Sequence, residues 1–450
     1  MRIAIVGSGP SGFHAVEALQ KALPAAQIDL YDRLPTPFGL VRGGVAPDHP
    51  KIKSVTRVYD RLAAHPGFRF LGNVRIGSDL SHDELRAHYH AVLYATGAQA
   101  DRRLGVPGEG LSGSHAATEL VGWYNGHPDY RDLQFDLSTE SAAVIGIGNV
   151  AMDIARILAE SPDRLATTDL ATHALAALRQ SRIRTIFVIA RRGPVQAACT
   201  PPELKELGEL DDVDVIVDPR DLELDPLSEA ALAASDDRTT ARNLELLRQF
   251  AARGSTGAAR RIVFHFFASP IEFVGDDRLR GIGLVRNRLE PDGSGGVRAV
   301  PTNETTLLPA GIAFRSVGYR GLPIPGIPFD ERRGIIPNIR GRVHEMDGAP
   351  VPGLYVAGWI KRGPSGVIGT NKPCALESVQ QLLQDAEAGR LPEPEATTST
   401  DELLANRGVR VVSWSDWLKL DAIEQERGAA NGRPREKFAT VREMLEALGA

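Results

Sequence analysis

The sequence predicts an α/β fold built from two units of similar local organisation. In each unit, a short apolar run of strand-forming residues leads directly into a glycine-rich turn, and apolar residues at helical spacing follow the turn. These arrangements begin at residues 2 and 142. Because further apolar runs alternate with helical patterns, we expect parallel sheets with helices on their faces.

The first turn reads GSGPSG and follows the apolar run 2–6. Gly7 allows a tight turn, Gly9 allows the backbone to approach phosphates, and Gly12 allows the helix to pack closely on the strand. The start of that helix offers unpaired N–H groups and a positive dipole end to an anion. The turn therefore predicts a Rossmann-like, dinucleotide-binding unit; a turn that binds nothing is the alternative.

The next apolar run ends in an acidic residue, Asp32. An acid about 20 to 25 residues beyond the glycines accepts hydrogen bonds from an adenosine ribose. The first site is therefore expected to take a dinucleotide without a phosphate on that ribose.

The second turn carries the accepted variant G-x-G-x-x-A, from Gly146 to Ala151. Its next apolar run, 185–190, ends in Arg191 and Arg192 instead of an acid. A carboxylate would repel a ribose 2′-phosphate, whereas a guanidinium pairs with it through two hydrogen bonds. We therefore expect NADP(H) at the second site, with merely solvated arginines as the alternative.

Composition narrows the class of protein. The 450 residues are 42% hydrophobic and 24% charged, with a formal net charge of −5, which gives no support for nucleic-acid binding. No apolar run approaches the roughly 20 residues of a membrane span, and a strand predicted from Arg2 onward leaves no room for a signal peptide. A cytoplasmic protein is expected.

The two cysteines, Cys199 and Cys374, are too far apart for a C-x-x-C pair and too few for an Fe–S cluster.

Other segments are assigned by periodicity. Helices are expected at 51–62, which has a basic face, and at 165–178, 238–253 and 375–388; short strands are expected at 68–71, 74–76, 91–94, 262–264 and 282–285. Residues 293–296 predict a hairpin loop, and 391–400 a linker before a helical tail.

His49 lies in a loop rich in proline and glycine, where a histidine is either functional or simply solvated.

In combination, several motifs resemble the adrenodoxin-reductase-type ferredoxin–NADP⁺ reductases, particularly the bacterial members. The matching stretches are PTPFGLVRGGVAPDHPKIKS, LYATGA, AVIGIGNVAMDIARIL, ARRGPVQAA and YVAGWIKRGPSGVIGTNK. The resemblance implies an FAD domain interrupted by an inserted NADP domain, related to the glutathione reductase architecture. The expected boundaries are 1–105 and 324–390 for FAD, 106–323 for NADP, and 391–450 for a linker and helical segment packed on the FAD domain.

The resemblance also implies the site residues. FAD contacts are expected from Ser11, Asp32, Leu40, Ile76, Trp359, Gly366, Val367 and Ile368. NADP contacts are expected from Arg102, Ile147, Gly148, Asn149, Val150, Arg191, Arg192, Glu203 and Gly366. His49, with Asp153 or Glu206, is expected beside the junction of flavin and nicotinamide as a catalytic group. Many relatives have Glu where this chain has Asp32, so the ribose contact is either direct or through water.

The function that the resemblance implies is hydride transfer from NADPH to flavin N5, then one-electron transfer to an external iron–sulfur protein. An acidic ferredoxin is the expected partner, steered by basic helices, and a monomer is expected. The alternatives are another NADPH-dependent flavoenzyme, of diaphorase, disulfide-reducing or monooxygenase type, and a cofactor-holding electron-transfer subunit without turnover of its own. The missing cysteine pair counts against disulfide reduction.

Overall fold

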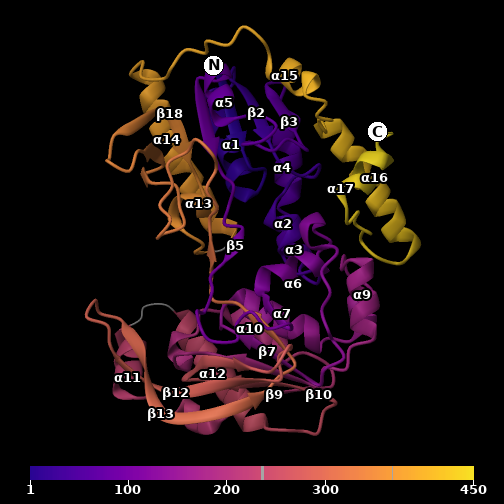
Figure 1. The fold of residues 1–450 in the computed structure, drawn as a ribbon, viewed down its shortest axis with the longest axis vertical. Helices are drawn as coiled ribbons and strands as arrows, with labels where there is room; N and C mark the ends of the chain where they lie inside the picture. The colour runs from indigo at the N-terminus through magenta and orange to yellow at the C-terminus, as the bar shows by residue number, and fades with distance from the viewer. Residues whose placement is uncertain (235–237, 367, 450) are drawn as a thin grey trace. The chain divides into compact units, whose positions relative to one another are not determined.

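The structure is a computed structural model that describes residues 1–234, 238–366 and 368–449. The described residues form two compact units, each with its own hydrophobic core (Figure 1). The first unit comprises 1–100, 125–129 and the described part of 318–450, and the second comprises 101–124 and the described part of 130–317. The chain therefore leaves the first unit and later returns to it.

The first unit contains a largely parallel sheet with the strand order β16–β17–β18–β4–β1–β2–β3. Its strands are β1 (Arg2–Val6), β2 (Gln27–Tyr31), β3 (Phe68–Leu71), β4 (Ala91–Tyr94), β16 (Asn338–Ile339), β17 (Arg342–His344) and β18 (Pro350–Val356). Its helices are α1 (Pro10–Ala22), α2 (Leu40–Gly43), α3 (Pro50–Lys53), α4 (Thr56–Ala63), α5 (His82–His88), α13 (Trp359–Arg362), α14 (Asn371–Glu387), α15 (Thr400–Asn406), α16 (Trp414–Ala430) and α17 (Val441–Ala447), with a 3₁₀ turn η4 (Ile368–Thr370).

Alternation along β1 explains why this sheet is covered on both faces. Ile3 and Ile5 lie in the same core cluster as apolar residues of α1 and α14, whereas Ala4 and Val6 belong to the cluster on the opposite face. Burial of each large aliphatic side chain stabilises the fold by about 1.5–3 kcal/mol. Figure 1 shows indigo β-strands beside orange β18 and α14; β18 pairs in parallel with β4 although the whole second unit separates them in sequence.

The second unit is built on a parallel sheet with the order β6–β14–β7–β8–β10–β9. Its strands are β6 (Ser114–Ala116), β7 (Ser141–Ile145), β8 (Thr185–Ile189), β9 (Val213–Val217), β10 (Arg260–His265) and β14 (Ile312–Arg315). Its helices are α6 (Ala117–Tyr124), α7 (Asn149–Ala159), α8 (Pro162–Leu165), α9 (Thr172–Arg179), α10 (Pro201–Leu207), α11 (Pro226–Ala234) and α12 (Arg238–Arg253), with 3₁₀ turns η2 (Pro194–Gln196) and η3 (Pro219–Leu222). The short elements β5 (Ala100–Asp101), η1 (Pro128–Tyr130) and β15 (Tyr319–Arg320) lie near the unit boundaries.

A separate antiparallel sheet covers one face of this parallel sheet. It consists of β11 (Ala268–Val274), β12 (Gly281–Pro291) and β13 (Val297–Pro309), with the loop 292–296 joining the last two strands. Ala143 and Ile145 of β7 share a core cluster with Phe273 and Ile282 of this sheet. Ala142 and Val144 face the helices instead, in a cluster that includes α7.

Three local predictions were wrong, because side chains compete for the backbone hydrogen bonds. The helix expected at 165–178 is two short helices, since the Thr168 hydroxyl donates to Leu165 O and accepts from Leu170 N between them. The helix expected at 51–62 is divided into α3 and α4 at Ser54, whose hydroxyl donates to Lys51 O. The strand expected at 74–76 is a loop in which Arg75 N donates to the Asp79 carboxylate.

Length and hydropathy also distinguish these helices from membrane spans. Across residues 1–234, 238–366 and 368–449, none is both long and apolar enough to cross a membrane.

Candidate functional site

The first glycine-rich turn joins β1 to α1. A Cβ atom on Gly12 would lie 2.0 Å from Gly7 O, so only glycine permits the helix to approach the strand this closely. A Cβ atom on Gly9 would meet only the Gly39 Cα, at 3.9 Å. The backbone at Gly9 therefore borders open space at the N-terminus of α1, where Gly9 is the N-cap.

Asp32 follows β2 and is tied to this turn. One carboxylate oxygen accepts hydrogen bonds from Ser8 N, at 3.0 Å, and from the Ser8 hydroxyl, while the other accepts from Leu34 N at 3.0 Å. A carboxylate has about four acceptor positions, so these three bonds leave one for a ligand hydroxyl. Asp32, although its side chain is shorter than that of glutamate, is thus compatible with a ribose contact.

A second loop-to-helix junction packs against the first turn within the same unit. Ser11 Oγ donates to Asn371 Oδ1 at the start of α14, at 3.0 Å, and a Cβ on Gly358 would lie 2.2 Å from Ser11 Oγ. Trp359 stacks on Tyr319 with ring centroids 5.8 Å apart. The unit therefore brings the turn 7–12 against Gly358 and Asn371 at the start of α1.

Four further residues expected to contact FAD lie in this unit. Leu40 begins α2 and is 48% exposed, and Ile76 is partly buried against the core. Gly366 has a positive φ of 79° beside Thr370, and Ile368 opens η4. Val367 lies outside the described residues.

Helix α2 is held by a buried ionic cluster that sequence reasoning missed. Glu424 of α16, which is fully buried, accepts two hydrogen bonds from the Arg42 guanidinium and others from Arg435 and Phe438 N. Lys437 Nζ donates to Arg42 O at 3.3 Å. Burial alone would raise the pKa of Glu424, but the charges of Arg42 and Arg435 lower it overall. The C-terminal segment therefore fixes α2, which contains Leu40.

The second turn joins β7 to α7 with the same backbone arrangement. Gly146 has a φ of +136°, and a Cβ there would lie 2.1 Å from Ser316 O. Nothing lies within 4 Å of the position that a Gly148 Cβ would occupy. Ile147 O accepts a hydrogen bond from Ala198 N, and Asn149 Oδ1 accepts one from Thr200 N at 2.8 Å. Val150 packs on the core of the unit. The predicted residues thus surround an open helix N-terminus.

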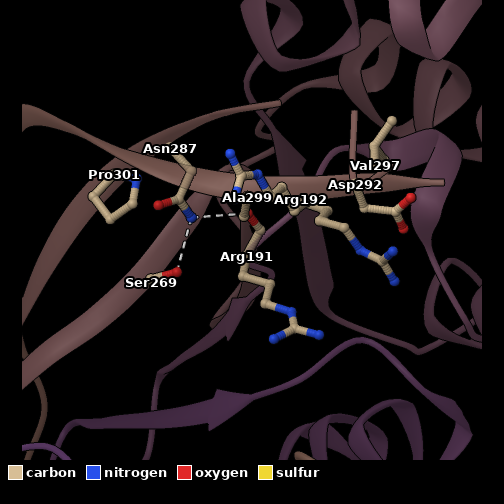
Figure 2. A pocket seen from close by; sticks show the side chains of 9 residues that line it. Arg191, Arg192, Ser269, Asn287, Asp292, Val297, Ala299 and Pro301 are labelled. Atoms are coloured by element: carbon tan, nitrogen blue, oxygen red, sulfur yellow. Dashed lines mark hydrogen bonds between the residues drawn. The ribbon is translucent and has the colours of Figure 1, made fainter. Parts of the chain in front are cut away.

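Arg191 and Arg192 follow β8 and line a pocket of about 390 Å³ (Figure 2). The other lining residues come from β11, β12, β13 and the loop between the last two: Ser269, Asn287, Asp292, Val297, Arg298, Ala299 and Pro301. Within the described ranges, neither guanidinium of this arginine pair forms a hydrogen bond or an ion pair. Burial, and then the adjacent charge of Arg191, lower the pKa of Arg192. The charge of Asp292 opposes this shift, but its carboxylate forms no hydrogen bond with either arginine among the described residues, so the guanidinium donors stay available to an anion.

The expected acids of the second unit meet around one arginine that sequence reasoning did not single out. Arg156 of α7 is 3% exposed and donates to Asp153 at 2.7 Å and to Glu203 at 3.2 Å, and it lies 3.3 Å from Glu206. Asp153 and Glu203 are buried, and Glu206 is partly exposed. A charged residue three positions after Asp153, within an otherwise apolar helix face, was the available signal.

His49 and Arg102 belong to different units. His49 is the partly buried N-cap of α3, and Arg102 is exposed near the start of the second unit. Their expected roles stay predictions.

Fold and site together define a class of protein: an α/β protein with two glycine-rich dinucleotide turns, one beside an acid and one beside an arginine pair. Residues 1–187 match the family model described as pyridine nucleotide-disulphide oxidoreductase. The chain is 48% identical to the NADPH-ferredoxin reductase FprA of Mycobacterium tuberculosis over 98% of both chains. It is 44% identical to the mitochondrial NADPH:adrenodoxin oxidoreductase of Arabidopsis thaliana, over 99% of this chain and 95% of that one.

A solved structure of M. tuberculosis FprA in complex with NADPH superimposes with a TM-score of 0.93 at 46% identity, covering 100% of this chain and 99% of that chain. The chain belongs to the family of NADPH-ferredoxin reductases and NADPH:adrenodoxin oxidoreductases. The resemblance stated from the sequence motifs is thereby confirmed.

Proposed function

We propose that this protein is an FAD-dependent NADPH:ferredoxin oxidoreductase. The observation that carries the proposal is the opposite charge at the ends of β2 and β8: Asp32 in the first unit, and Arg191 with Arg192 in the second. The names of the relatives, and the NADPH in the FprA complex, support the same assignment.

The residues of the first unit fit an adenine dinucleotide without a ribose phosphate. The space beside Gly9 is open to a pyrophosphate, and Asp32 retains one acceptor position for a ribose hydroxyl. The FAD ligands that we assign are Gly7, Gly9, Ser11, Gly12, Asp32, Leu40, Ile76, Trp359, Gly366, Val367 and Ile368. When bound, FAD supplies acceptance of a hydride at N5 and release of electrons one at a time.

The residues of the second unit fit NADP(H). The open backbone at Gly148 suits the pyrophosphate, and the unpaired guanidinium groups suit the 2′-phosphate. The ligands that we assign are Arg102, Ile147, Gly148, Asn149, Val150, Arg191, Arg192, Glu203 and Gly366. On this assignment, 1–105 and 324–390 are the FAD domain, 106–323 the NADP domain, and 391–450 a linker and helical segment on the FAD domain.

Three titratable residues are assigned to the region where the two cofactors react. His49 supplies an imidazole, a side chain that can donate or accept a proton, and Asp153 and Glu206 supply carboxylates. Arg156 fixes Asp153 through a 2.7 Å hydrogen bond and lies 3.3 Å from the carboxylate of Glu206. These side chains would orient the nicotinamide and exclude water from it.

The partner that we assign is an acidic ferredoxin. Helix α12 carries Arg238, Arg242, Arg248 and Arg253, and α3 and α4 carry Lys51, Lys53, Arg57 and Arg61. Opposite charge accelerates encounter between proteins. A monomer and a cytoplasmic location complete the proposal.

The test uses the purified, flavin-loaded protein without oxygen. Addition of NADPH should bleach the flavin absorbance, and cytochrome c should then be reduced only when a ferredoxin is added. Cytochrome c reduction without ferredoxin would favour a diaphorase, and oxygen consumption that depends on an organic substrate would favour a monooxygenase. A flavin that NADPH does not bleach would contradict the proposal, because only a cofactor-holding subunit would remain.

A further inference from the structure

The pocket beside the arginine pair contains one buried amide, that of Asn287. This residue lies on β12 where the pairing with β13 shifts register, between Val285 and Asn287. Such a bulge redirects a side chain relative to the regular alternation of a strand. Asn287 is 5% exposed, and Figure 2 shows its side chain next to Arg191 and Ser269.

The contacts of Asn287 reach the backbone of both arginines. Its Nδ2 donates to Arg191 O and to Ser269 Oγ, each at 2.8 Å. Its own N–H donates to Phe267 O at 2.6 Å, and Phe267 N donates in turn to Arg192 O at 3.1 Å. The carbonyl groups of Arg191 and Arg192 are therefore held, directly and through Phe267, by one residue.

The orientation of the amide follows from chemistry. A flipped amide would place Oδ1 against Arg191 O, and two acceptors would then face one another. In the orientation observed, Oδ1 is buried and accepts no hydrogen bond from the described residues. The observed orientation therefore leaves Oδ1 of Asn287 without a hydrogen bond but keeps the Nδ2 donor on the backbone of Arg191.

The arginine pair needs such support. Two adjacent guanidinium groups repel each other, and pairing with a phosphate through two hydrogen bonds requires both to be placed within about 0.5 Å. We propose that Asn287 is a positioning residue that fixes the arginine backbone and so sets the preference of the enzyme for a 2′-phosphorylated dinucleotide. The inference rests on the proposed function, since it assigns the arginine pocket to that phosphate.

The test compares 2′,5′-ADP with ADP, which differ in the 2′-phosphate that the arginine pair would bind, by calorimetric titration of the flavin-loaded enzyme. The wild type should prefer 2′,5′-ADP. Asn287→Ala should reduce that preference about tenfold while ADP affinity stays constant. Asn287→Asp keeps the shape of the side chain but replaces the Nδ2 donor with a negatively charged oxygen. In this variant the preference for 2′,5′-ADP should fall by close to a hundredfold, because the change affects a charged contact.

Asn243→Ala is the matched control. Asn243 is also buried in the second unit, donates through Nδ2 to a backbone carbonyl, that of Cys199, at 2.7 Å, and has an Oδ1 without a partner among the described residues. Its loss should lower the thermal midpoint but leave the ratio of the two affinities unchanged. A preserved ratio in both Asn287 variants would overturn the positioning role. A wild type without any preference would instead overturn the assignment of the pocket to NADP(H).

Discussion

The two glycine-rich turns share a backbone arrangement but differ in the residues that end the next strand along the chain, β2 in one unit and β8 in the other. In the first, Asp32 already accepts three hydrogen bonds from Ser8 and Leu34. In the second, the arginine pair donates none within the described ranges. We infer that the first site is organised before ligand binding, as a retained cofactor requires, whereas the second gains its strongest contacts only when an anion arrives.

The residue after the first glycine shows the same difference. Ser8 connects the first turn to Asp32, whereas Ile147 in the second turn packs against the apolar core. One sequence position thus supplies a polar link in one unit and an apolar contact in the other. Substitutions can test each part of this contrast.

Removal of both arginines should have the largest effect. Each charged hydrogen bond to a 2′-phosphate contributes about 1.5–3 kcal/mol. Replacement of Arg191 and Arg192 by Ala should therefore lower kcat/KM for NADPH roughly a hundred- to ten-thousand-fold, mainly through KM, and leave the use of NADH nearly unchanged. Arg288→Ala, which removes an exposed charge from β12 outside the pocket lining, is the control. Equal losses of kcat/KM with NADPH and with NADH would refute the assignment of the arginine pair to the 2′-phosphate.

The organisation of the first site depends on Glu424. Glu424→Gln leaves Arg42 and Arg435 without their buried carboxylate, so the free energy of unfolding should fall by about 3–5 kcal/mol. Tryptophan fluorescence during urea unfolding measures this loss, because Trp417 lies in the same helix. The exposed Glu426→Gln on α16 should change stability by less than about 0.5 kcal/mol. A Glu424 variant as stable as the control would show that α2 is held by other contacts.

The same cluster predicts a dependence on pH. The folded pKa of Glu424 lies below its ordinary 4.5, because Arg42 and Arg435 outweigh the effect of burial. Its contribution to stability is therefore complete above the ordinary pKa and is lost as pH falls through the lower, folded value. Wild type should lose more stability than Glu424→Gln on acidification, and their unfolding free energies should converge. Parallel pH profiles would contradict the assignment.

Asp32→Ala should weaken the first site alone. It removes the acceptor of Ser8 N and Leu34 N, together with the proposed ribose contact, so the dissociation constant for FAD should rise about ten- to a hundredfold. Fluorescence of released flavin measures it. The affinity for 2′,5′-ADP should not change, and a fall in that affinity would show that the acid acts beyond its own unit.

Ser8→Ala should have the smallest effect. It removes the hydroxyl but keeps the Ser8 N–H bond to Asp32, so a loss of about 1 kcal/mol, or roughly fivefold in FAD affinity, is expected. A loss as large as that of Asp32→Ala would mean that the hydroxyl, and not the carboxylate, organises the turn.

Local sequence patterns were sufficient to predict both glycine-rich turns and the arginine pair after the second one. Strand, glycine turn and helix are contiguous at 2–22 and at 141–159, so residue type and spacing determine them. The α/β class and the helix predicted at 238–253 were confirmed for the same reason. Glycine spacing also indicated where the backbone stays open, at Gly9 and Gly148.

Long-range polar contacts could not be predicted. Glu424 pairs with a residue 382 positions earlier, and Asn287 with one 96 positions earlier. The apolar residues around Glu424 and Asn287 predict a helix and a strand but not the polar partners of these two residues, because an ion pair or a single amide leaves no trace in local periodicity. Arg156 was missed for a related reason: its partners Glu203 and Glu206 come from α10, whose position on α7 is set by tertiary packing.

The strand order of the first sheet has a consequence for biosynthesis. β18 lies between β4 and β17, and α16 carries the acid that holds α2, yet both leave the ribosome after the whole second unit has been made. Domains generally fold as units while the chain emerges. The second unit can thus be finished during translation, whereas the sheet of the first unit is completed only after β18 has emerged, and α2 gains its buried acid only with α16.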